Sequence, residues 1–364
     1  MTLNTPDPDF HYLTKAFASV ARVPVQTSRL STHVSMYGPE NGVPVVFVHG
    51  NLSAGRWWHD TMLRLPDGLR AIAPDLRGYG GAELGALIDA TRGMGDFSDD
   101  LAALFDTLGL EAAHLVGHSL GGSVLWRFLA DHPARVLSLT QVSPGSPYGF
   151  GGTRADGSPA FADGAASGAG AVNPEFARRL AMGDRSSDSE AAPRNVLNTF
   201  VWAPPFVPHA IEDLLDAALA QHTGPQAYPG DAQPSANWPG SAPGRYGPVN
   251  ALAPIYQSHP VAFCDVTDKP PILWLRGDRD MVVSDMSMFD LGALGQMGAV
   301  PGWPGPGVVP PQPMVAQTEA ALAFYEARGG QVRRVVLQNC GHSPYLEQPE
   351  AFDQAFHLHL RGIA

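Results

Sequence analysis

The chain has 364 residues, of which 44% are hydrophobic and 16% are charged, and its formal net charge at pH 7 is −12. This length and composition are typical of a globular protein with a large core, and they exclude an intrinsically disordered chain. Nucleic acids and anionic membrane surfaces are negatively charged, so the acidic balance makes both poor candidates as partners.

The N-terminal residues 1–7 contain neither a basic region nor an apolar run, so we expect no signal peptide. We also find no run of about 18 apolar residues that would predict a membrane-spanning helix. The two cysteines, Cys264 and Cys340, are too few for a disulfide framework. We expect both to be free thiols in a reducing cytoplasm, with Cys340 acting as a small core residue although it lies close to His342.

The N-terminal zone, residues 1–144, alternates short apolar runs with helical patterns. We predict strands at 45–48, 71–73, 114–116 and 136–140, and helices at 97–108 and 123–130. Gly109 and Pro133 would end these two helices, and Asp96 or Ser98 could cap the first of them. Strands that alternate with helices predict an α/β fold with a mostly parallel central sheet and helices on both faces.

The middle zone, residues 145–268, breaks this rhythm. It contains Gly-rich and Pro-rich stretches and no alternating strand pattern, with helical patterns at 174–182 and 211–220. We interpret it as a mainly helical and loop cap inserted into the core.

The C-terminal zone, residues 269–364, resumes the core. It is predicted to contain strands at 272–275 and 335–337, a Gly/Pro loop at 292–313, and helices at 317–328 and 349–360.

A G-x-S-x-G motif runs from Gly117 to Gly121, with Ser119 at its centre. A predicted strand precedes it and a predicted helix follows, as a nucleophile elbow requires. The flanking glycines leave room for the sharp turn, and the N-terminus of the helix favours negative charge that develops at Ser119. The alternative interpretation is a plain strand-to-helix turn with a capping serine.

A serine hydroxyl needs a neighbouring base to become a good nucleophile. His342 has the best placement, because it follows the last predicted strand, and the carboxyl ends of parallel strands face the usual ligand crevice. His49 and His118 belong to other motif positions. His357 and His359 form an H-x-H pair, but side chains two positions apart on a helix point away from each other, so we do not expect a shared metal.

The base needs a carboxylate that fixes its tautomer. Asp278 and Asp280 both follow the strand predicted at 272–275, and Asp285 is a more distant candidate. Either of the first two could be the acid, and Asp280 lies three residues after Gly277, where the turn begins. The chain order is then Ser, Asp, His, which differs from the orders of the serine proteases.

Backbone N–H groups should form the oxyanion hole. Leu120 directly follows the nucleophile, and Asn51 lies in the turn after the strand predicted at 45–48. We predict that the N–H groups of these two residues hold the oxyanion.

Taken together, these motifs resemble the α/β-hydrolase superfamily. The resemblance covers about residues 30–145 and 270–362. The motifs that carry it are His49-Gly50-Asn51, Asp75-Leu76-Arg77-Gly78-Tyr79-Gly80, Gly117-His118-Ser119-Leu120-Gly121-Gly122, Gly277-Asp278-Arg279-Asp280 and Gly341-His342. The resemblance places the acid three residues after Gly277, so we favour Asp280 over Asp278. It also implies an inserted cap, no cofactor and no metal, with Asp75 and Arg77 as residues that build loops. Some relatives with H-G-N are dehalogenases or epoxide hydrolases, which use an aspartate nucleophile, and the serine at position 119 argues against both.

The expected substrate is an ester or lactone of a bulky, mostly apolar small molecule. Aromatic residues in the cap, Trp202 and Phe206 in particular, and Leu52 near the oxyanion loop are the predicted substrate-binding residues. Alternatively, the cap aromatics form the cap's own core. Hydrolysis of a C–C bond in a β-diketone, acyl transfer or perhydrolysis, and a non-catalytic receptor remain alternative functions. We expect a monomer or a homodimer.

Overall fold

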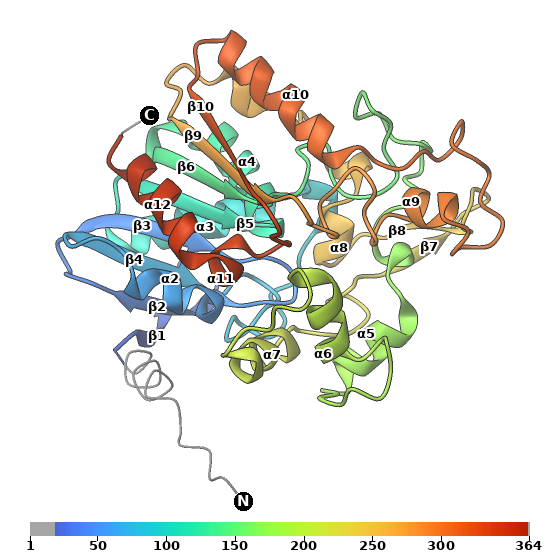
Figure 1. Cartoon of the computed structure of the whole chain (residues 1–364), viewed down its shortest axis with the longest axis horizontal. Coiled ribbons are helices and arrows are strands. Elements are labelled where there is room, and N and C mark those ends of the chain that lie inside the picture. Colours follow the sequence, from blue (N-terminus) through green and yellow to red (C-terminus); the bar gives the residue numbers. More distant parts are fainter. Residues whose placement is uncertain (1–18, 363–364) are drawn as a thin grey trace, which may run out of the picture.

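A mixed sheet of eight strands forms the centre of the computed structural model, which describes residues 19–362 (Figure 1). In spatial order the strands are β1 (Ala21–Gln26), β2 (Ser31–Tyr37), β4 (Leu69–Pro74), β3 (Val43–Val48), β5 (Ala113–His118), β6 (Val136–Val142), β9 (Ile272–Gly277) and β10 (Val332–Leu337). The six strands from β4 to β10 in this order are parallel, while β1 and β2 are antiparallel at one edge. The predicted, mostly parallel sheet is therefore confirmed.

Helices pack on both faces of this sheet. On one face lie α3 (Gly95–Leu108), α4 (Leu120–Asp131) and α10 (Met314–Ala327), and on the other lie α2 (His59–Leu63) and α12 (Pro349–Leu360). Side chains of a strand alternate between faces, so in β3 Val46 and Val48 pack toward α3 and α4, while Val45 and Phe47 pack toward α2 and α12. The central strands are buried on both sides, which explains their continuous apolar runs.

Between β6 and β9 the chain leaves the sheet. This segment contains α5 (Pro174–Ala181), α6 (Pro193–Val196), α7 (Ile211–Leu219), α8 (Pro248–Ala251), β7 (Ala232–Pro234) and β8 (Ser241–Pro243), together with a π-helical turn, η5 (Leu197–Val201). Figure 1 shows α5, α6 and α7 grouped together, with β7 and β8 beside α9 (Leu291–Gln296). The β7–β8 hairpin corrects the expectation of no strands here, because three-residue strands are too short to show an alternating pattern.

Other local predictions had mixed outcomes. Helix α3 ends at Gly109, which has a left-handed backbone, as expected. The capping prediction was wrong, because Met94 precedes the helix without a side-chain cap. Asp96 instead accepts a hydrogen bond from Arg29, and Ser98 donates one to Asp131.

Both cysteines are buried and free, as predicted. Burial raises the pKa of the Cys264 thiol to about 12 and places that of Cys340 far above its usual value, so both thiols stay protonated at neutral pH. Within residues 19–362 no helix combines the length and apolar character needed to cross a bilayer. The expectation of no signal peptide concerns residues 1–7, which lie outside the described part of the chain.

Candidate active site

Ser119 lies at the junction of β5 and α4, at the carboxyl edge of the sheet. Its backbone has a φ of 55° and a ψ of −118°, which is rare for a residue with a side chain and costs about 1–3 kcal/mol. The turn is held by hydrogen bonds from the backbone N–H of Ser119 to Val142 O (3.1 Å) and from the N–H of Gly145 to Ser119 O (3.1 Å). A Cβ on Gly121 would come within 2.2 Å of Val48 O, so the close approach of α4 to β3 requires glycine there.

Asp280 and His342 form a buried pair. His342 Nδ1 lies 2.8 Å from Asp280 Oδ2, and the two residues are only 3% and 7% exposed. The second carboxylate oxygen of Asp280 accepts hydrogen bonds from the backbone N–H groups of Val282 (2.8 Å) and Val283 (2.9 Å). A proton on Nδ1 that is donated to Asp280 leaves Nε2 of His342 free to accept a proton.

The two other candidate acids, Asp278 and Asp285, accept hydrogen bonds elsewhere. Asp278 is exposed, and its carboxylate accepts a hydrogen bond from the backbone N–H of Cys340 (3.2 Å). Asp285 accepts hydrogen bonds from the N–H groups of Val315 and Ala316 at the start of α10. Of the three aspartates considered, the structure brings Asp280 to His342.

A cavity of about 580 Å³ collects most of the predicted site residues. Ser119, His342, Leu120, Asn51 and Leu52 all line it. The nucleophile and base predicted from the sequence therefore face one common space, together with both residues predicted to supply oxyanion N–H groups.

Trp202 and Phe206 do not line this cavity, which corrects their prediction as substrate-binding residues. Trp202 is 1% exposed and packs in the core cluster that contains α2 and α12, where its ring centroid lies 6.5 Å from that of Trp57. Phe206 packs against the same cluster. The aromatic residues that line the cavity are instead Trp57, Phe150, Phe176, Phe200, Tyr228 and Phe289.

His49 organises the turn that carries Asn51. Its Nε2 accepts a hydrogen bond from the backbone N–H of Leu76 (2.9 Å), so Nδ1 carries the proton that is donated to Gly50 O (2.8 Å). Burial lowers the pKa of His49 to about 4, so the ring is neutral at physiological pH. The side-chain oxygen of Asn51 accepts a hydrogen bond from Tyr79 Oη (2.8 Å), which fixes this side chain within the turn.

His118 supports the loop of the base. Its Nε2 donates a hydrogen bond to the carbonyl oxygen of His342 (2.9 Å), and Tyr345 Oη donates to its Nδ1 (3.4 Å). Burial, reinforced by the neighbouring His342, lowers the pKa of His118 well below its usual value. His118 is therefore a neutral structural residue that holds the backbone of His342.

Asp75 and Arg77 build loops outside the cavity. The carboxylate of Asp75 accepts hydrogen bonds from the N–H groups of Gly55 and Gly81, both at 2.8 Å. The guanidinium of Arg77 forms a bidentate pair with Asp100 at 2.6 and 2.7 Å. Within residues 19–362 we find no cluster of His, Cys, Asp and Glu side chains that could hold a metal ion.

Glu347 is a polar contact that the sequence analysis missed. Its carboxylate accepts hydrogen bonds from the backbone N–H groups of Gly341 (2.7 Å) and Ser343 (3.1 Å), on either side of His342. It also accepts one from the N–H of Ala203 (2.8 Å), in the segment between β6 and β9. The spacing of five residues from the base was visible in the sequence, but the distant contact to Ala203 has no local signal.

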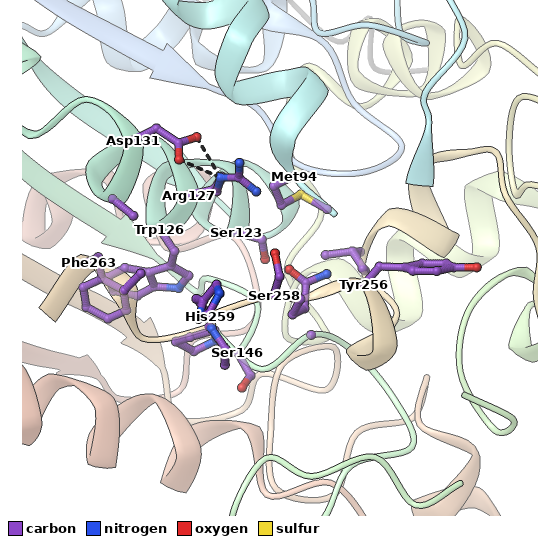
Figure 2. Close-up of a pocket in the computed structure, with 17 residues that line it drawn as sticks. Met94, Ser123, Trp126, Arg127, Asp131, Ser146, Tyr256, Ser258, His259 and Phe263 are labelled. Atoms are coloured by element: carbon purple, nitrogen blue, oxygen red, sulfur yellow. Dashed lines mark hydrogen bonds and ion pairs between the residues drawn. The ribbon is translucent and has the colours of Figure 1, made fainter. Parts of the chain in front are cut away.

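A second, smaller cavity of about 230 Å³ lies along α4, where it is lined by residues from Ser123 to Asp131 (Figure 2). Figure 2 shows the Arg127–Asp131 ion pair along its edge, with Trp126 and Phe263 stacked below. Ser123 lines both cavities, but none of the triad candidates lines this one.

Comparison with known proteins identifies the family. A family model described as alpha/beta hydrolase fold matches residues 43–293, more than half of the chain. The chain belongs to the α/β-hydrolase family. The fold, the strand order and the position of Ser119 after β5 are consistent with this assignment.

The chain is 32% identical to carboxylesterase YbfK of Bacillus subtilis over 124 residues, which are 34% of this chain and 41% of that esterase. The matched stretch thus spans about two fifths of that relative's length. The crystal structure of the same esterase covers 98% of this chain and 98% of its own, with a TM-score of 0.59 and 18% identity. A putative lipase of Acinetobacter baumannii covers 100% of this chain and 98% of its own, with a TM-score of 0.60 and 17% identity. At these identities the structural likeness shows the fold alone.

Proposed function

We propose that the protein hydrolyses carboxylic esters or lactones of bulky, mostly apolar small molecules, with Ser119 as nucleophile, His342 as base and Asp280 as the supporting acid. The observation that carries this proposal is the 2.8 Å contact between His342 and Asp280 at a cavity that Ser119 also lines. The partial similarity to a carboxylesterase supports the same class of reaction.

The proposed reaction has two halves. His342 Nε2 takes the proton of Ser119 Oγ as the hydroxyl oxygen attacks the ester carbonyl, and Asp280 stabilises the imidazolium that forms. The N–H groups of Leu120 and Asn51 hold the oxyanion, and each such donor contributes about 3–4 kcal/mol to the transition state. The intermediate collapses and releases the alcohol, which takes the proton from His342. A water molecule, deprotonated by His342, then hydrolyses the acyl-enzyme.

The cavity supports the proposed substrate class. Its volume of about 580 Å³ lies within the range of small-molecule sites, and aromatic and aliphatic side chains line most of it. Phe176, Val196, Phe200 and Val201 come from the segment between β6 and β9. We therefore propose that residues 145–268 act as a cap over a core made of residues 1–144 and 269–364.

The test is a turnover screen of the purified protein over esters, lactones and β-diketones, with Ser119→Ala as the matched variant. We expect ester or lactone turnover, which the variant loses by about six orders of magnitude while its thermal unfolding is unchanged. Turnover of a β-diketone to a ketone and an acid, without ester turnover, would replace the proposed reaction with C–C hydrolysis. Activity that persists in the variant would remove Ser119 from the mechanism.

A further inference from the structure

The carboxylate of Glu347 joins two parts of the molecule that lie far apart in the sequence. Oε2 accepts hydrogen bonds from the N–H groups of Gly341 and Ala203, and Oε1 accepts one from the N–H of Ser343. Two of these donors flank His342, while the third belongs to the segment between β6 and β9. A single side chain thus holds the loop of the base against the inserted segment.

The two backbones touch where this carboxylate binds. A Cβ on Gly341 would lie 2.6 Å from Ala203 N and 2.8 Å from Trp202 C, so only glycine permits this approach. Trp202 is 1% exposed and packed in the core cluster that contains α2 and α12, which anchors the inserted segment at this point.

The residues directly before this contact form a wall of the candidate active site. Leu197, Phe200 and Val201, all from the π-helical turn η5, line the cavity. Turns of this kind are rare, and they occur often at functional sites. Only Trp202 separates Val201, which lines the cavity, from Ala203, whose N–H donates a hydrogen bond to Glu347.

The charge of Glu347 is balanced mainly by backbone dipoles. Burial raises the pKa of its carboxyl above the usual value, and the three N–H donors and the nearby His342 oppose this rise. A carboxylate that accepts several N–H hydrogen bonds is held in a fixed geometry, since each bond constrains its position and orientation.

We propose that Glu347 is a positioning residue that couples the cavity wall at residues 197–201, through its hydrogen bond from Ala203 N–H, to the base His342. Glu347 holds the imidazole of His342 in position to take the proton of Ser119 Oγ only while the residues of this wall keep their positions. The wall contacts the substrate, so an acyl group that fits it favours the geometry in which His342 acts. This inference rests on the proposed ester hydrolysis.

The experiment compares Glu347→Gln with Glu350→Gln as matched control. Glu350 is exposed on α12, three residues further along the chain, and has no part in the site. The glutamine at 347 keeps the size of the side chain, but its amide NH₂ faces backbone N–H groups, so at least one hydrogen bond is lost. Active sites are counted by titration with a fluorophosphonate, and kcat is expressed per titrated site.

We expect Glu347→Gln to lower kcat per site by about tenfold to hundredfold, the effect of a displacement of about 1 Å in a reacting group, with a smaller change in KM. The rate of fluorophosphonate labelling should fall in parallel, because labelling also needs His342. Glu350→Gln should match the wild type in every readout. A purely structural role would lower the melting temperature and the number of titratable sites, yet leave kcat per site unchanged.

A second variant tests the coupling itself. Gly341→Ala places a methyl group against Ala203 and should push the wall and the loop apart. If both substitutions act through the same contact, the double variant loses less than the product of the two single losses.

The proposed coupling would be overturned if the loss of kcat in the double variant equals the product of the two single losses. It would also be overturned if kcat per site in Glu347→Gln stays within about twofold of the wild type. A wild-type protein that turns over no ester and is not labelled at Ser119 would refute the proposed function instead. The two failures are therefore distinguishable.

Discussion

The carboxyl edge of the sheet and the wall of the cavity are built in different ways. At the edge, Ser119, Asp280 and His342 each follow a parallel strand, and backbone hydrogen bonds hold the turns that carry them. The wall comes largely from residues 172–201, where the elements are short helical pieces. The proposed catalytic residues thus lie on turns that follow strands of the sheet, whereas irregular segments supply much of the cavity lining.

The largest effect is expected at the edge. Asp280→Asn should lower kcat by about four orders of magnitude, because the amide no longer selects the Nδ1–H tautomer of His342. Asp278→Asn is the matched control and should stay close to the wild type, since Asp278 is exposed and an asparagine oxygen can still accept the hydrogen bond from Cys340 N–H. Steady-state kinetics on one ester decides the point, and equal losses in both variants would contradict the assignment of the acid.

The stability of the edge should depend on pH through His49. Its pKa of about 4 in the folded state lies below the unfolded value of about 6.5, so the unfolded state binds more protons between these two values. The contribution is complete above about pH 6.5 and is lost as the pH falls to about 4, by up to about 3 kcal/mol.

Urea unfolding between pH 7 and pH 4 measures this loss. His49→Asn has no titrating group and should show a smaller decline in the free energy of unfolding over the same range. Equal declines in the two proteins would show that His49 does not contribute to the pH dependence.

Selectivity should change at the wall and not at the edge. Phe200→Ala removes an aromatic side chain that lines the cavity, so kcat/KM for a bulky p-nitrophenyl ester should fall about tenfold relative to a short one. Trp202→Phe should leave the ratio unchanged, because Trp202 lies outside the lining and its indole N–H has no hydrogen-bond partner within residues 19–362. A change in selectivity with Trp202→Phe alone would contradict the assignment of the wall.

The smallest effect is expected at the oxyanion turn. Asn51→Ala should reduce kcat by less than about tenfold, because the proposed donor is the backbone N–H. It should still cost about 1–3 kcal/mol in stability, since Tyr79 Oη loses its acceptor. Adding Tyr79→Phe should recover part of that loss in thermal unfolding. A drop in kcat of a hundredfold or more would indicate that the amide side chain itself binds substrate.

The contrast between the sheet edge and the cavity wall also explains which features could be predicted from the sequence. The buried strands were predicted because continuous apolar runs identify them, and the G-x-S-x-G motif placed Ser119 after one of these strands. The edge strands β1 and β2 were missed: β1 is almost entirely exposed and carries no apolar run.

The wall was harder to predict. Both Phe200 and Trp202 are aromatic residues of the inserted segment, but the π-helical turn ends at Val201, and the backbone of Trp202 is extended. That local change places Phe200 in the cavity and Trp202 in the core. The contact of Glu347 with Ala203 depends on how two distant segments pack, which no motif or spacing records.

The most direct test of the account is the site of covalent modification by a fluorophosphonate that inactivates the enzyme, located by mass spectrometry. We predict one adduct, on the peptide that contains Ser119, with loss of esterase activity in proportion to labelling. Labelling at another residue, or full modification of Ser119 with activity retained, would contradict the proposed mechanism.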